Sequence, residues 1–150
     1  MKVKDIMTRK VVTVKPGMKI PELARLLVRK NISGAPVVDT KGKLLGLVLE
    51  ESLIFQDKKV HLPTVVAVLN GFLTFGEEKY EQEMNKIVAR TAEGIMDENP
   101  LVLSPRVDIT DAATLVVEKN IHYFPVVEAG KLVGVVTKRD IVKAIAKGKI

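Results

Sequence analysis

The sequence predicts an α+β fold made of two similar halves that are joined by an insert. Met7 and Met96 open two stretches that run in register at a spacing of 89 residues. Each stretch carries the same order of strand, helix, strand, strand and helix patterns, and the segment between them has no counterpart. Two copies of so long a repeat are too few for a solenoid, so they indicate one pseudo-symmetric pair of domains. A binding site between the copies is therefore expected.

In the first copy, the β-branched run Val11–Val14 predicts a short strand, which the turn residues Pro16 and Gly17 end. The apolar spacing over Ile20–Lys30 predicts a helix, since a proline in the first helical turn removes no intrahelical hydrogen bond. Asn31 is expected to end this helix.

Two further strands of the first copy are expected over Ala35–Asp39 and Lys43–Glu50. Gly42 lies between them and can adopt the positive φ that short turns often need. The sequence therefore predicts a β-hairpin here.

The second copy repeats this order, with the expected elements Leu101–Leu103 (strand), Ile109–Lys119 (helix), Phe124–Glu128 and Lys131–Thr137 (strands) and Lys138–Lys147 (helix). Asp108 and Asp111 are spaced as in a capping arrangement for the first of these helices.

The insert is expected over residues 57–90, between a first copy at 1–56 and a second at 91–150. Its second half, 77–90, places apolar side chains on one face of a predicted amphipathic helix, namely Tyr80, Met84, Ile87 and Val88. This helix is expected to pack on the core or on a second subunit. Its Glu-rich polar face argues against binding to a membrane surface.

The composition is that of a globular protein with an ample core, since 47% of its 150 residues are hydrophobic. No apolar run reaches the roughly 18 residues that a membrane span needs, and the charged start lacks the apolar stretch of a signal peptide. We therefore expect a cytoplasmic protein. Cysteine is absent, and His61 and His122 have no spacing typical of a metal site.

The formal net charge of +6 favours anionic partners, which include nucleotides, nucleic acid and acidic proteins. Much of the excess lies near the C-terminus, at Lys138, Arg139, Lys143, Lys147 and Lys149. Such residues also complement a helix dipole, so a solvated helix end remains an alternative. A nucleic-acid-binding or oligomerisation scaffold is the second functional hypothesis, although aromatic residues are few. An enzyme is not expected, because no cysteine nucleophile, phosphate-binding glycine loop or Ser-His-acid arrangement is visible.

Motifs that occur in both copies resemble those of the tandem cystathionine β-synthase (CBS) domain, or Bateman module. They are VKDIMT and AEGIMD, NISGAPVVD and NIHYFPVVE, and GKLLGLVLEES and GKLVGVVTKRD. The resemblance implies two β-α-β-β-α repeats packed about a pseudo-two-fold axis, with two clefts between them. It further implies a regulatory module that binds AMP, ADP, ATP or S-adenosylmethionine without chemistry on the ligand. Two modules often pair in this family, so a homodimer and a separate regulated protein are expected.

Thr137 and Asp140 lie at the expected junction of the last strand and the last helix. A carboxylate offers two oxygens to the two hydroxyls of a ribose, and the helix start offers unpaired N–H groups to a phosphate. Arg139 and Lys138 could contact phosphate by their charge. The alternative is that TKRD only caps the helix.

In the family, the acid of one copy works with a base pocket from the other copy. Carried over to this chain, Asp140 would face a pocket made by Lys10, Val12, Ile32, Ser33 and Ala35. Backbone groups of Lys10–Val12 would read the edge of adenine. The alternative for Val12, Ile32 and Ala35 is a place in the core.

The first copy departs from the family pattern, because Leu49 and Ser52 stand where the second copy has Thr137 and Asp140. Glu50 and Glu51 add negative charge that disfavours phosphate. We therefore expect weak or no binding in the second cleft, which would be lined by Leu101, Ile121, His122 and Tyr123. His122 could face phosphate or be structural.

Overall fold

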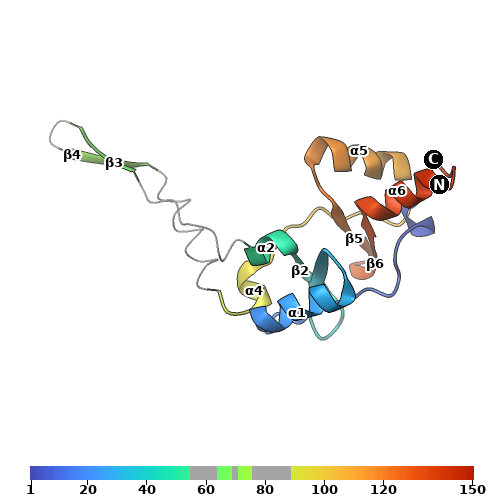
Figure 1. The fold of residues 1–150 in the computed structure, drawn as a ribbon, viewed down its shortest axis with the longest axis horizontal. Coiled ribbons are helices and arrows are strands. Elements are labelled where there is room, and N and C mark those ends of the chain that lie inside the picture. The colour runs from blue at the N-terminus through green and yellow to red at the C-terminus, as the bar shows by residue number, and fades with distance from the viewer. Residues whose placement is uncertain (55–63, 69–70, 76–88) are drawn as a thin grey trace.

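The structure is a computed structural model that describes residues 1–54, 64–68, 71–75 and 89–150 (Figure 1). The first half contains α1 (Ile20–Lys30), β1 (Gly34–Val38), β2 (Leu44–Leu49) and α2 (Glu50–Ile54). The second half contains α5 (Ile109–Lys119), β5 (Tyr123–Glu128), β6 (Lys131–Thr137) and α6 (Lys138–Ala146). The remaining elements are the 3-10 turn Val3–Asp5, β3 (Thr64–Val68), β4 (Gly71–Phe75) and α4 (Ala92–Ile95). The predicted α+β fold with two similar halves is confirmed.

The predicted helices Ile20–Lys30 and Ile109–Lys119 are confirmed as α1 and α5 with the same bounds. Each ends at an asparagine in the left-handed conformation, Asn31 with φ 51° and Asn120 with φ 53°. Asparagine tolerates this conformation better than most residues, which is why it can stop a helix.

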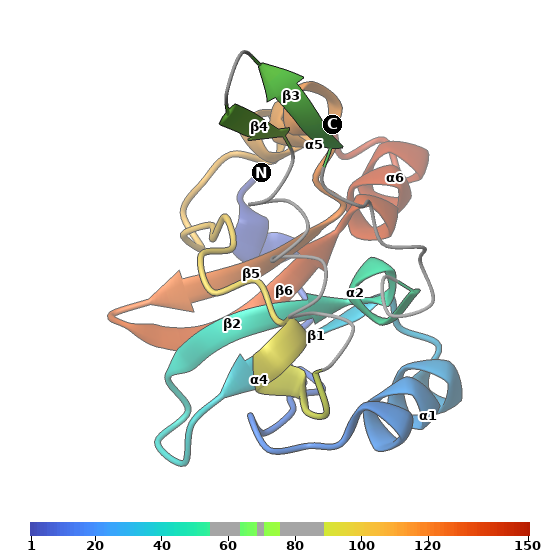
Figure 2. The same cartoon turned by 90° about the vertical axis from the view of Figure 1, so that its left-hand side faces the viewer.

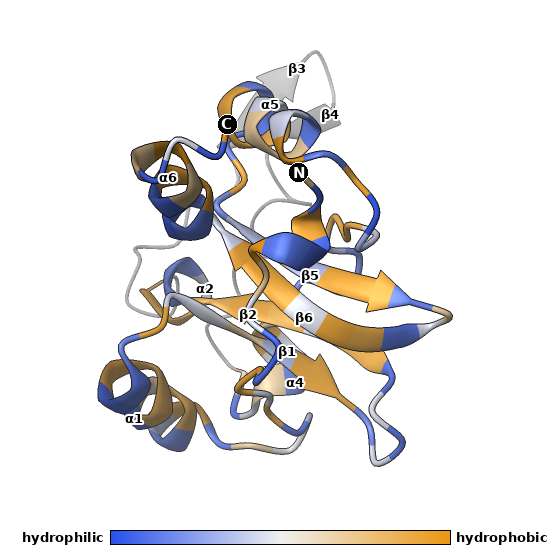
Figure 3. Cartoon of the chain, turned by 90° about the vertical axis from the view of Figure 1, so that its right-hand side faces the viewer, coloured by the Kyte–Doolittle hydropathy of each residue, from blue (hydrophilic) through white to orange (hydrophobic). Residues whose placement is uncertain are grey.

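Two antiparallel hairpins form the sheets, β1 with β2 and β5 with β6. Gly42 and Gly130 occupy their turns with φ of 79° and 77°. Both hairpins carry a register shift at the same point of the repeat, at Val37/Val38 and at Val126/Val127. Figure 3 shows that the strands are predominantly hydrophobic, as expected for strands that build a core.

The strands predicted at Val11–Val14 and Leu101–Leu103 are wrong as continuous strands. Only the last residue of each run joins a sheet, as a parallel bridge of Val14 to Val37 and of Leu103 to Val126. Each bridge has two backbone hydrogen bonds of 2.9–3.0 Å. Val11 and Val12 of the first run instead lie at a cavity wall.

The two hydrophobic cores exchange their opening segments. Val3 is fully buried in the core of the second half, with Ile109, Phe124 and Val136. Ala92, its counterpart in the repeat, is fully buried in the core of the first half. Each segment is held by equivalent backbone bonds: Val3 N–H donates to Val107 O at 2.8 Å, and Ala92 N–H donates to Met18 O at 2.9 Å. Each hydrophobic core therefore contains the opening segment of the other copy, so the two cores do not coincide with the two copies as they follow one another in the sequence.

The chain crosses between the halves where each opening segment meets a strand of the other sheet. Thr8 pairs with Val135 of β6 through two hydrogen bonds of 2.9 and 3.0 Å. Asp97 pairs with Leu47 of β2 through two hydrogen bonds of 2.9 Å. Figure 2 shows β6 and β2 next to each other at the centre, with β5 and β1 outside them. Leu47, Tyr123 and Val135 form a small cluster across this junction.

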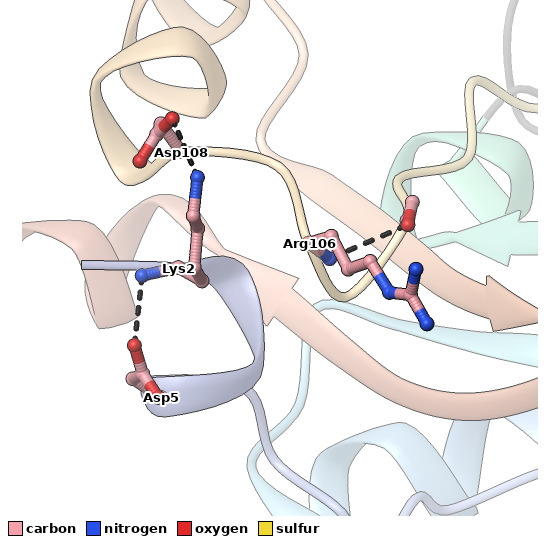
Figure 4. Close-up of polar contacts among 5 residues, drawn as sticks. Lys2, Asp5, Arg106 and Asp108 are labelled. Carbon is pink, nitrogen blue, oxygen red and sulfur yellow. Dashed lines mark hydrogen bonds and ion pairs between the residues drawn. The ribbon is translucent and has the colours of Figure 1, made fainter.

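The predicted capping by Asp108 is wrong, because its side chain makes no cap hydrogen bond to α5. Its carboxylate instead accepts a hydrogen bond from Lys2 Nζ at 2.8 Å (Figure 4). The backbone of Lys2 is bridged to that of Asp108, which brings the ammonium group within reach. A charge-assisted bond of this kind is stronger than a bond to a neutral amide.

The described part of the insert is a hairpin in which β3 pairs with β4. The sequence analysis did not predict it, although the β-rich runs TVVAV and GFLTF around a glycine were a usable signal. The predicted helix of the insert, with Tyr80, Met84, Ile87 and Val88, lies outside the described residues, as does His61. Within the described ranges, no helix is long and apolar enough to cross a membrane.

Candidate functional site

A cavity of about 720 Å³ lies between the two halves and takes residues from both. It contains eleven of the twelve predicted site residues: Lys10, Val12, Ile32, Ser33, Leu101, Ile121, His122, Tyr123, Thr137, Arg139 and Asp140. The two clefts predicted from the family are therefore the two ends of one continuous space, the α6 end and the α2 end. The sequence analysis named these eleven residues as site residues, but it did not predict that the two clefts form one continuous cavity.

At the α6 end, Thr137 and Asp140 form a capping box at the start of the helix. Thr137 donates twice to the same carboxylate oxygen, Asp140 Oδ2, from its backbone N–H at 2.9 Å and from its hydroxyl at 2.7 Å. Asp140 N–H donates back to the Thr137 hydroxyl oxygen at 3.4 Å. Thr137 and Asp140 therefore cap the helix, which was the alternative role predicted for TKRD.

The cap is compatible with ligand binding, because it uses only one oxygen of the carboxylate. Asp140 Oδ1 has no hydrogen-bond partner within the part of the chain that the structure describes. The cap fixes the side chain of a residue that lines the cavity, so the second oxygen is held in a defined position as an acceptor.

The first half contributes a wall of the same cavity, which includes Lys10, Val12 and Ile32. Among the described residues, the backbone N–H and C=O groups of Lys10 and Val12 have no hydrogen-bond partner. Ile32 both lines the cavity and packs on the first-half core. Polar backbone groups beside an apolar side chain can bind a flat, hydrogen-bonding ring.

Gly34 also lines this wall, and the sequence analysis missed it. A Cβ on Gly34 would lie 2.7 Å from Leu49 Cδ2 and 2.9 Å from Val48 O, so only glycine fits. Its place next to Ser33 in NISGAP was the available signal.

Ala35 requires a correction. Its side chain is fully buried in the first-half core and does not line the cavity. The reason is that successive residues of a strand point to opposite faces, and Ala35 lies with Val37 on the face of β1 that packs into the core. Its predicted contact with a base therefore does not hold for the side chain.

The α2 end has the same backbone geometry and different side chains. Glu50 N–H donates to Ser33 O at 3.0 Å, as Lys138 N–H donates to His122 O at 3.0 Å in the second half. The cap here is only a bond of 3.3 Å from Leu49 N–H to the Ser52 hydroxyl. This end therefore has no carboxylate in the position of Asp140.

The helix starts at the two ends of the cavity differ in charge. Lys138, Arg139 and Lys143 of α6 outnumber the single carboxylate of Asp140, whereas α2 contributes Glu50 and Glu51. None of these side chains forms an ion pair with another described residue. An anionic ligand is therefore attracted to the α6 end and repelled from the α2 end.

Tyr123 lies between the two ends, although it was assigned only to the second cleft. Burial, and secondly the charge of Asp140, hold the pKa of its phenol well above the ordinary value. The hydroxyl therefore stays protonated and can donate a hydrogen bond. His122 is exposed at the cavity. Within the described ranges, no group of three or more His, Asp or Glu side chains could hold a metal ion.

The CBS domain family model matches residues 3–59 and 92–147, which are the two copies of the repeat. The chain belongs to the CBS domain family. Protein MJ1426 of Methanocaldococcus jannaschii is 30% identical over 97% of this chain and 91% of its own length. The chloroplastic CBS domain-containing protein CBSX1 of Arabidopsis thaliana is 31% identical over 93% of this chain. The chain spans 62% of that plant protein.

Among solved structures, the chain is similar to CBSX2 in complex with AMP, with a TM-score of 0.76 and 28% identity. That match covers 99% of this chain and 98% of the chain in that solved structure. The CBS domain pair of protein MJ0100 is similar in fold, with a TM-score of 0.73 and 24% identity over 99% of this chain and 98% of that one.

Proposed function

We propose that this CBS pair is a regulatory sensor that binds one adenine nucleotide at the α6 end of the cavity. The observation that carries the proposal is the Asp140 carboxylate. One of its oxygens is fixed by Thr137 and the other is unpaired, inside a cavity that both halves line.

Each part of a nucleotide has a suitable partner at this end. The free oxygen of Asp140 can accept from a ribose hydroxyl. The unpaired backbone of Lys10 and Val12 can read the edge of adenine, with Ile32 against its face. Lys138 and Arg139 can neutralise phosphate. The solved complex of CBSX2 with AMP supports an adenine nucleotide as the ligand of a similar chain.

The α2 end is expected to bind weakly or not at all. It has Ser52 in place of the acid, and Glu50 and Glu51 would repel phosphate. One ligand per chain is therefore proposed.

The proposed output is a change in how the two halves pack. A ligand that contacts both halves biases their arrangement only by its difference in affinity, typically about 1–3 kcal/mol. The proposal includes a homodimer and a separate regulated protein in the cytoplasm, and it includes no catalysis.

Calorimetric titration with AMP, ADP, ATP and S-adenosylmethionine tests the proposal. At least one of them should bind wild-type protein, and Asp140→Ala should lose that binding while Ser52→Ala keeps it. Binding of none of the four would overturn the function, and unchanged binding by Asp140→Ala would overturn the site.

The unpaired cations at the α6 end also fit the alternative of a nucleic-acid-binding scaffold. The salt dependence of ligand affinity distinguishes the two functions. Affinity for an oligonucleotide falls steeply with salt through counterion release, whereas adenosine, which has no phosphate, should bind the sensor with little salt dependence.

A further inference from the structure

Residues 1–8, here called the strap, belong to the first copy but dock on the second half. Val3 is fully buried in the second-half core, and Ile6 and Met7 pack against the same core. Val3 N–H donates to Val107 O at 2.8 Å. Figures 2 and 3 show the N-terminus on the side of α5 and α1 on the opposite side.

The strap runs directly into a span that is anchored only at its two ends. Thr8, the last residue of the strap, pairs with Val135 of β6 through two hydrogen bonds of 2.9 and 3.0 Å. The next anchor is Val14, which is bridged to β1 of the first half. Among the described residues, no backbone group of the span 9–13 bonds to another element.

This span carries the backbone that the proposed function assigns to adenine. Lys10 and Val12 line the cavity, and their N–H and C=O groups have no partner among the described residues. A ligand bonded to these groups would supply the support that the span lacks between its anchors. Because Thr8 is one of the two anchors, a span held by ligand also favours the docked strap.

We propose that a nucleotide at the α6 end and the docked strap stabilise each other, so that the strap is the segment that responds to the ligand. The inference rests on the proposed function and adds its regulation. Such coupling is reciprocal: a ligand that prefers the docked strap holds it in place, and undocking weakens the ligand by the same factor. An undocked strap uncovers the apolar site of Val3 on the second half, so the ligand controls the exposure of that surface.

The chain contains a matched control for the strap. Residues 90–97 occupy the same place in the repeat and dock on the first half, where Ala92 is fully buried and Asp97 pairs with Leu47. The span that follows contains Leu101, which was predicted to line the second cleft. The proposed function places no nucleotide there. Docking of residues 90–97 should therefore not respond to AMP.

Hydrogen exchange of backbone amides, followed by NMR with and without AMP, measures the coupling in wild-type protein. Thr8 N–H, which donates to Val135 O at 2.9 Å, is compared with Asp97 N–H, which donates to Leu47 O at 2.9 Å. With AMP at about a hundred times its dissociation constant, exchange at Thr8 should slow by about 100-fold if only the docked strap binds, and exchange at Asp97 by less than about twofold. Equal slowing of both amides, or of neither, would overturn the inference.

Two corresponding glycines allow the reciprocal test. A Cβ on Gly134 would lie 2.7 Å from Met7 Sδ of the strap, and a Cβ on Gly46 would lie 2.6 Å from Met96 Sδ of the control segment. Neither glycine lines the cavity. In calorimetry, Gly134→Ala should weaken AMP binding several-fold, whereas Gly46→Ala should bind AMP as wild type does.

An equal loss of affinity in both glycine variants, or no loss in either, would contradict the coupling. Val3→Ala loosens the strap at a single buried side chain and should weaken AMP binding in the same direction, which keeps the test valid if Gly134→Ala does not fold.

The same titrations separate this inference from the proposed function. AMP that binds wild-type protein but leaves exchange at Thr8 unchanged overturns the inference alone. Absence of binding by AMP, ADP, ATP and S-adenosylmethionine overturns the proposed function, and the inference with it. If one of the other three binds in place of AMP, that ligand is used in the exchange experiment with the same expected results.

Discussion

At the scale of single residues, the difference between the two ends of the cavity lies in four consecutive positions. The second half has TKRD where the first has LEES. In the structure, one carboxylate oxygen of Asp140 accepts two hydrogen bonds at the start of α6. At the start of α2, the Ser52 hydroxyl accepts only one long hydrogen bond. Replacing LEES by TKRD (Leu49→Thr, Glu50→Lys, Glu51→Arg, Ser52→Asp) should therefore raise the calorimetric stoichiometry of AMP from one per chain towards two. A stoichiometry that stays at one in a folded variant would contradict this reading.

Corresponding glycines in β6 and β2 leave room for Met7 and Met96, the corresponding methionines of the two copies. A Cβ on Gly134 would lie 2.7 Å from Met7 Sδ and 3.1 Å from Thr8 O. Gly134→Ala should lower the free energy of unfolding by about 1–3 kcal/mol through overpacking. Urea denaturation measures it, with Gly17→Ala as the control because nothing lies within 4 Å of its added Cβ. Equal stability of the two variants would contradict the prediction.

Most candidate site residues could be predicted from the repeat and the family motifs, because those motifs lie at the cavity wall. The sequence did not distinguish Gly34 from Ala35, which follow Ser33 in one motif. Which of these two neighbours faces the cavity depends on which face of β1 packs into the core, and Ala35 lies on the core face with Val37.

At the scale of elements, the exchange of opening segments makes the N-terminus part of the second-half core. Val3→Ala should cost about 2 kcal/mol of unfolding free energy, because it removes fully buried methyl groups. The control is Val28→Ala, whose side chain is 82% exposed and should change stability by less than about 0.5 kcal/mol. Thermal or urea unfolding compares them, and a Val3 variant as stable as its control would argue against the exchanged packing.

The contact between Lys2 and Asp108 ties the same segment to α5. The side-chain hydrogen bond from Lys2 lowers the pKa of Asp108 below its ordinary value. A lowered carboxyl pKa stabilises the fold above the ordinary value, and this contribution is lost as the pH falls through the folded value. Lys2→Ala should raise the pKa of Asp108 in an NMR titration and reduce stability at neutral pH only. If the variant and wild type still differed in the free energy of unfolding in strong acid, this assignment would be contradicted.

The helices and hairpins were predictable because each follows a local pattern: apolar spacing for α1 and α5, and a glycine turn for β1–β2. The short parallel bridges and the hydrogen bond of the Asp108 side chain could not be predicted from such local patterns. Both depend on residues far away in the chain, such as Val37 for Val14 and Lys2 for Asp108.

At the scale of the whole molecule, the repeat predicted a pseudo-symmetric pair but not the exchange between its halves. Val3 and Ala92 occupy the same position of the repeat, so the sequence alone does not say which core each one joins. The crossing of the chain between the halves also contributes to the cavity. The chain crosses at Thr8 and Asp97, and both residues line the cavity that runs past the crossing.

The central claim is that Asp140 recognises a ribose, and comparing AMP with 2′-deoxy-AMP on wild-type protein and on Asp140→Asn tests it most directly. Asparagine can still accept the cap bonds of α6, so the fold should be kept. Wild-type protein should bind AMP roughly tenfold more tightly than the deoxy ligand, as expected for one hydrogen bond to a charged group, and this preference should be markedly smaller in the variant, because an amide makes only a neutral hydrogen bond with the hydroxyl. Equal binding by wild-type protein, or a preference for AMP that is undiminished in Asp140→Asn, would contradict the claim.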